Sequence, residues 1–104
     1  MRKLFFIGFI VLVGCFQAKV KHDKELLFRI IEDIRVGWEN GDGTPFRDHF
    51  LDWDGARYFE GGGQNIGLED LIINHVEPEA ELGLKLGFTN IQTHFEGNFA
   101  WAVV

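Results

Sequence analysis

The chain contains one cysteine and no serine, and its basic residues are outnumbered by its acidic ones. The single thiol, Cys15, cannot form an internal disulfide. The absence of serine removes a common hydroxyl nucleophile from the possible chemistry. The balance of 16 acidic against 10 basic residues disfavours nucleic acid, whose binding needs basic patches that displace counterions from phosphates. We therefore expect a small acidic domain with no nucleic-acid partner.

The chain also lacks an apolar run long enough to cross a membrane. Arg2 and Lys3 precede an apolar run at residues 4–13, and a membrane-spanning helix needs about 20 such residues. A short run after basic residues is typical of a bacterial export signal. The run ends in Leu12-Val13-Gly14-Cys15, which resembles a lipobox, in which the cysteine is acylated after cleavage.

These features predict how the chain is divided and where it is located. We expect a signal peptide at 1–14, a lipid-anchor tether at 15–22 and a single domain at 23–104. The acylated Cys15 would hold the domain at the membrane of the bacterial cell envelope. Cleavage near Ala18, giving a secreted or periplasmic protein, is the alternative.

Two helices are predicted in the first half of the domain. Residues 23–40 carry apolar side chains at three- and four-residue spacings, which is the period of an amphipathic helix. These side chains are Leu26, Leu27, Ile30, Ile31, Ile34 and Trp38. Thr44 and Pro45 predict the start of a shorter helix that reaches about Phe50, with the Thr44 hydroxyl as its cap and the proline in its first turn.

A strand, a glycine loop and a third helix are predicted next. Residues 56–59 are expected to form the strand, and residues 61–67, which include three consecutive glycines, the loop. The helical stripe is Leu68, Leu71, Ile72 and Val76. His75 falls on the same stripe, so its imidazole should face whatever the helix packs on. Pro78 is expected to limit this helix, since proline disfavours a helical residue before it.

The remaining residues have the period of strands. Apolar residues alternate with others over 84–88 and again over 91–95, with a change of phase that predicts a bulge or bend near Thr89 and Asn90. Glu96-Gly97-Asn98 predicts a tight turn into a returning strand that begins at Phe99. The sequence therefore predicts an α+β fold in which helices cover a curved antiparallel sheet.

The order of these elements resembles a known superfamily. The segments that carry the likeness are Ile34-Arg35-Val36-Gly37-Trp38-Glu39-Asn40-Gly41-Asp42, Ala56-Arg57-Tyr58-Phe59-Glu60-Gly61, Gly67-Leu68-Glu69-Asp70-Leu71 and Glu96-Gly97-Asn98-Phe99-Ala100-Trp101-Ala102-Val103. Residues 28–104 are similar to the nuclear transport factor 2-like superfamily, in particular its SnoaL-like and ketosteroid-isomerase-like members. The resemblance implies a cone-shaped domain that often encloses a ligand cavity.

The resemblance also implies that the domain is incomplete, and it suggests the functions that the domain could have. Such a domain normally continues through two more strands, so the C-terminus is expected to lie inside a strand and the domain to be truncated. Relatives act as isomerases, cyclases, dehydratases or binding modules, and none of the ketosteroid isomerase's catalytic residues can be placed in this chain. An open sheet edge favours pairing with another chain, so a homodimer is one expectation.

Five residues are candidates for the site. His75 is a candidate acid–base group, because histidines exchange protons near neutral pH, and Tyr58 is a candidate donor to a bound carbonyl. A hydrogen-bonded core histidine and a packing tyrosine are the alternatives. Trp38 and Trp101 are expected to line the cavity with apolar surface, with packing in the core as the default for both. His94 is expected to contact the ligand if its side of the strand faces the cavity.

A metal site is not predicted. His75-Val76-Glu77-Pro78-Glu79 places an imidazole near carboxylates, but stable zinc sites usually need three or four converging ligands. We therefore expect no metal and no cofactor. The functional hypotheses are an envelope-tethered module that binds a small apolar or carbonyl-bearing molecule, a cofactor-free isomerase, cyclase or lyase, and a dimeric interaction module.

Overall fold

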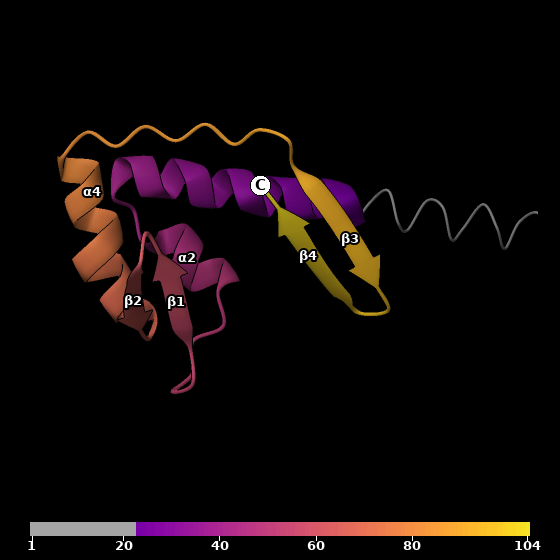
Figure 1. Ribbon diagram of the computed structural model, residues 1–104, viewed down its shortest axis with the longest axis horizontal. Helices are drawn as coiled ribbons and strands as arrows, with labels where there is room; N and C mark the ends of the chain where they lie inside the picture. Colours follow the sequence, from indigo (N-terminus) through magenta and orange to yellow (C-terminus); the bar gives the residue numbers. More distant parts are fainter. Residues whose placement is uncertain (1–22) are drawn as a thin grey trace, which may run out of the picture.

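The computed structural model describes residues 23–104, so the predicted signal peptide, the tether and Cys15 lie outside the described residues. A helix over residues 23–40 runs the length of the described fold, and the other elements pack along it (Figure 1). The fold is α+β, as predicted, with helices and two small antiparallel sheets. The expected single curved sheet is wrong for these residues, because the two hairpins do not pair with each other.

The helical predictions are largely confirmed. The long helix occupies residues 23–40, and α2 spans Thr44–His49. The predicted hydroxyl cap of α2 is wrong: Gly43 is the N-cap residue, and a carboxylate oxygen of Asp42 accepts a hydrogen bond from the Thr44 backbone N–H at 2.9 Å. That hydrogen bond holds the pKa of Asp42 below its usual value, because it favours the ionised form.

The predicted strand and glycine loop form one hairpin. β1 (Arg57–Glu60) pairs antiparallel with β2 (Gly63–Ile66), so four of the seven residues predicted as loop are in fact a strand. Gly61 and Gly62 form the connecting turn with φ of 56° and 85°. A two-residue turn with positive φ at both positions matches the right-handed twist of paired strands, and glycine adopts it without steric cost.

The third helix is longer than predicted and changes its period. It begins as α3 (Leu68–Leu71), widens into the π-helical η1 (Ile72–Val76) and continues as α4 (Glu77–Glu81). The prediction that Pro78 limits the helix is therefore wrong. In the π-helical turn the Glu77 N–H bonds to the carbonyl of Ile72. Pro78, which lacks an N–H, directly follows this widened turn, so the helix changes its hydrogen-bond pattern next to the proline and does not end there.

The segment predicted as a strand at 84–88 is extended but unpaired. Its apolar side chains are half-buried and alternate with exposed ones, so the predicted alternation is present. The backbone of Leu86 bonds to side chains of the long helix instead of a strand: Glu39 accepts from the Leu86 N–H at 2.8 Å, and Arg35 donates to the Leu86 carbonyl at 3.2 Å. The Leu86 N–H lowers the pKa of Glu39.

The predicted bend and final hairpin are confirmed. Asn90 has a positive φ of 55°, which bends the chain at the predicted place. β3 (Gln92–Glu96) and β4 (Phe99–Val103) pair antiparallel across a turn at Gly97 and Asn98. The hairpin lies beside the N-terminal half of the long helix (Figure 1), and an apolar groove of about 360 Å³ separates the two.

The core lies between the long helix, α2 and the bent third helix. Its fully buried cluster is Phe46, Leu68, Leu71, Ile72 and Val76. Four of these five are the stripe predicted from spacing. Partly buried side chains, including Trp38 and Tyr58, surround the cluster. The described helices include none that is both long and apolar enough to cross a membrane.

Replacing Phe46 tests this account of the core. Phe46 is fully buried and contacts Trp38 and Phe50 edge-on. Phe46→Ala should lower the free energy of unfolding by about 3–5 kcal/mol, because it removes a large apolar side chain and leaves a cavity. Urea denaturation measures the change. Leu82→Ala is the control, since Leu82 is 87% exposed; equal losses in both variants would show that Phe46 is not a core residue.

Candidate functional site

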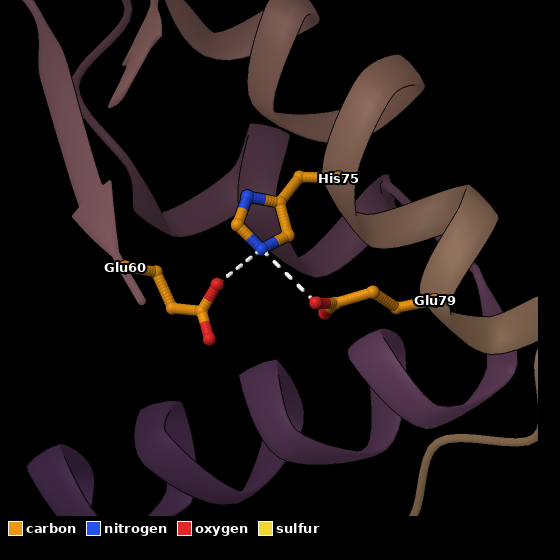
Figure 2. A group of neighbouring side chains, drawn as sticks. All are labelled: Glu60, His75 and Glu79. Carbon is orange, nitrogen blue, oxygen red and sulfur yellow. Dashed lines mark ion pairs between the residues drawn. The ribbon is translucent and has the colours of Figure 1, made fainter. Parts of the chain in front are cut away.

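The site is built around His75, which lies in the π-helical turn. Its side chain is 15% exposed and points toward β1 and the long helix (Figure 2). The ring nitrogen Nε2 contacts a carboxylate oxygen of Glu60, and lies 3.1 Å from Oε1 of Glu79. Glu60 ends β1, and Glu79 is one turn after His75 in α4. Three elements thus bring one imidazole and two carboxylates together.

The other ring nitrogen of His75 is held by Asn65. Nδ1 lies 2.8 Å from Oδ1 of Asn65 in β2. The amide nitrogen of Asn65 donates to Asp70 at 3.4 Å, and an ionised carboxylate can only accept. The amide oxygen is therefore the atom that faces the imidazole, and Nδ1 carries the proton that it shares with Asn65.

Asp70 anchors this part of the network. It accepts hydrogen bonds from the Asn74 side chain at 2.8 Å and from the Ile66 backbone N–H at 2.8 Å, as well as from Asn65. These bonds, the one from Asn74 first, hold the pKa of Asp70 below its usual value. The carboxylate thus ties the end of β2 to the helix that carries His75.

Trp38 closes the site from the long helix. Its indole N–H donates to Oε2 of Glu79 at 2.7 Å, and its ring meets the His75 ring edge-on at 5.5 Å. Glu79 therefore uses one oxygen for Trp38 and the other for His75. The carboxylate is fixed in position even though it is only half-buried.

A hollow of about 290 Å³ lies next to this cluster. Its wall is formed by Trp38, Phe50, Arg57, Tyr58, Phe59, Glu60, Asn65 and Leu71. The hollow is more enclosed than the groove beside the β3–β4 hairpin and than the open hollow near Trp53. It is the hollow that shares residues with the His75 cluster, since Glu60, Asn65 and Trp38 belong to both.

Tyr58 lies in the wall of this hollow but does not meet His75. Its ring stacks on Phe50 at 5.5 Å, and its hydroxyl donates to the Leu51 carbonyl at 3.3 Å. Burial raises the pKa of the Tyr58 hydroxyl, with a smaller contribution from the charge of Asp52. Among the described residues no hydrogen bond or ring contact joins Tyr58 to His75.

His94 and Trp101 lie elsewhere. They face each other across β3 and β4, with rings stacked at 5.3 Å. His94 is exposed and Trp101 is 50% exposed, whereas Thr93 and Phe95 point inward. The structure thus brings Trp38, Tyr58 and His75 into one region and leaves the other two predicted ligand-binding residues on the outer face of the second hairpin.

Sequence reasoning missed three residues of the site. From the sequence, Glu60 beside three glycines is either a carboxylate at the mouth of a cavity or a turn residue, with the turn favoured. Glu79 was noted only through its spacing from His75, and Asn65 was given no role. Glu60 and Asn65 lie 15 and 10 residues before His75, so only the hairpin brings them near it. A hairpin turn recognised at Gly61 and Gly62 would have placed both residues near the helix.

No protein-family model, curated protein or solved structure matches the chain.

The network around Asp70 makes a prediction about acid stability. A carboxyl whose pKa is lowered in the folded state contributes stability above its unfolded pKa, near 4, and that stability is lost as the pH falls through the lower folded value. Asp70→Asn should therefore lower stability at neutral pH and flatten the loss of stability as the pH falls below about 4.

Thermal unfolding followed by circular dichroism over that range measures the effect. Asp48→Asn is the matched control, since Asp48 is exposed on α2 and makes none of the hydrogen bonds described. The Asp70→Asn curve should converge on that of the unaltered chain at low pH. A constant offset at every pH would contradict the assignment.

Proposed function

We propose that the chain is a small-molecule-binding domain of the SnoaL-like type, within the nuclear transport factor 2-like superfamily, and that a lipid on Cys15 tethers it to the bacterial cell envelope. The observation that carries the binding proposal is the hollow of about 290 Å³ beside the His75 cluster, whose imidazole is 15% exposed. Its size lies at the lower end of ligand pockets. The occupant is therefore a small molecule.

The lining of the hollow supports a mostly apolar occupant. Leu71, Phe50 and the ring of Trp38 provide apolar surface, while Asn65 and Glu60 add polar groups. Mostly apolar walls with a small number of oriented polar groups are typical of ligand pockets. The support for the superfamily is the order of the elements along the chain, in which helices precede a hairpin, a third helix and a final hairpin.

The enzymatic alternative is less well supported. An acid–base mechanism needs a group positioned to stabilise the developing oxyanion. The Tyr58 hydroxyl, which was expected to do so, donates to the Leu51 carbonyl instead. Both ring nitrogens of His75 are also engaged by neighbouring side chains. A binding module needs neither group to be free.

Native mass spectrometry of the protein purified from its own envelope tests the binding proposal. The spectrum should show a small molecule retained by the folded chain and the mass of an acyl group on Cys15. Trp38→Ala should lose the small molecule, because it removes one wall of the hollow. Trp53→Ala is the control, since Trp53 is 57% exposed and lines a different hollow. Equal retention by both variants would contradict the proposal.

A specific observation also favours pairing of two copies. Among residues 23–104 the large apolar side chains that are exposed include Phe99, Trp101 and Val103 of β4, with exposed fractions of 79%, 50% and 56%. The outer edge of β4 has no partner strand in the described part of the chain. Exposed apolar strands of this kind pair readily with a second chain.

Sedimentation velocity of the purified protein tests pairing. We expect a dimer at micromolar concentration, and Phe99→Glu should shift it to monomer, because a charge would be buried in the contact. Leu82→Glu, at an exposed site in the turn after α4, should leave the dimer intact. An unaltered chain that sediments as a monomer at all concentrations would rule out pairing.

A further inference from the structure

We propose that Glu60, His75 and Glu79 bind a divalent transition-metal ion of the zinc type. The three ligand atoms lie within 4.8 Å of one another and come from β1, η1 and α4 (Figure 2). The inference is independent of which small molecule occupies the hollow. It also departs from the sequence, whose local spacing alone predicted no metal.

The first argument is the orientation of the imidazole. Asp70 accepts from the Asn65 amide nitrogen, so Oδ1 of Asn65 accepts from Nδ1 of His75 at 2.8 Å. Histidines that bind metals nearly always donate their other ring N–H in this way, which fixes the ring and leaves the second nitrogen available as a ligand. In this structure the second nitrogen, Nε2, is the one that faces both carboxylates, the two other proposed ligands.

The second argument is charge. With Nδ1 protonated, a neutral imidazole would point the lone pair of Nε2 at two carboxylates, and three electron-rich atoms would meet without a cation. A proton on Nε2 supplies one positive charge, against two carboxylates. A divalent ion supplies two and neutralises both carboxylates. On binding, the ion replaces the Nε2 proton, which is released to solvent.

The third argument is geometry. Tetrahedral zinc with ligands at about 2.1 Å holds neighbouring ligand atoms about 3.4 Å apart. Nε2 of His75 and Oε1 of Glu79 are already 3.1 Å apart. The Glu60 oxygen lies closer to Nε2 than this spacing, so the Glu60 side chain must move outward to make room for the ion. It is free to move, because it is 52% exposed at the end of a strand. Glu79 is held in place by the indole N–H of Trp38.

The donor set selects the kind of ion. One imidazole nitrogen with two carboxylate oxygens suits zinc and its neighbours in the first transition row, whereas Mg²⁺ and Ca²⁺ prefer all-oxygen sites. Three protein ligands leave a fourth position open, as in catalytic zinc sites. Glu60 also lines the hollow, so a donor atom of a bound molecule can reach that position.

Isothermal titration calorimetry with zinc chloride tests the site. The full chain in a Cys15→Ser background, which removes the one thiol, is first stripped with chelator. We expect one saturable site per chain that magnesium chloride does not fill. His75→Ala should weaken zinc binding by more than about 100-fold, and Asn65→Leu by about 10–100-fold, because outer hydrogen-bond partners contribute on that scale.

Two further variants make the result decisive. Glu60→Gln changes a half-exposed side chain, so the protein should stay folded by circular dichroism and still lose zinc affinity. His49→Ala removes an imidazole that pairs with Asp33 outside the cluster, and should keep the affinity of the unaltered chain. Substituted Co²⁺ should give the intense visible absorption of a four-coordinate ion.

The proposal is overturned if the unaltered chain shows no saturable zinc binding, or if His75→Ala and folded Glu60→Gln bind zinc as tightly as it does. The titration contains no organic ligand. Its failure would therefore leave the small-molecule proposal standing, and the loss of the small-molecule proposal would leave the zinc result standing.

Discussion

The packing of one apolar stripe against Phe46 determines where the chemical groups of this protein lie. Leu68, Ile72 and Val76 are buried on one side of the bent third helix. Because this side is fixed on α2 and the long helix, His75 can only point along the edge of the core toward β1. The imidazole is therefore placed by apolar burial, and the polar groups around it are arranged afterwards by hydrogen bonding.

Those hydrogen bonds follow a fixed direction because both ends of the network are carboxylates. Asp70 can only accept, so the Asn65 amide nitrogen turns toward it and the amide oxygen toward His75. At the other end, Glu79 accepts from the indole N–H of Trp38. The imidazole between them must therefore carry a proton on Nδ1. The long helix, β1, β2, α3, η1 and α4 thus share one polar network at the edge of the core.

Features with local causes could be predicted from the sequence. The helix at 23–40 and the buried stripe follow from a 3.6-residue period, and the turn at Gly97 follows from its residues. β2 was missed because Gly63, Gln64 and Asn65 have little strand propensity. Its pairing comes instead from the turn at Gly61 and Gly62, which returns the chain along β1.

Features with distant causes could not be predicted. Alternation over residues 84–88 shows correctly which side chains face inward, but no pattern in the segment indicates whether a strand lies beside it. Its actual partners are Arg35 and Glu39, about fifty residues earlier. The contact between Glu60 and His75 is of the same kind, since neither residue's neighbours contain a signal for the other.

The distribution of burial separates the fold into two parts of unequal stability. The buried apolar residues among 23–104 all lie between Phe46 and Val76, and none lies in β3 or β4. Local opening costs least where few apolar contacts are broken, so the second hairpin should open at lower free energy than the region around His75. The hairpin is thus the part best suited to rearrange on pairing, and its rearrangement need not disturb the site.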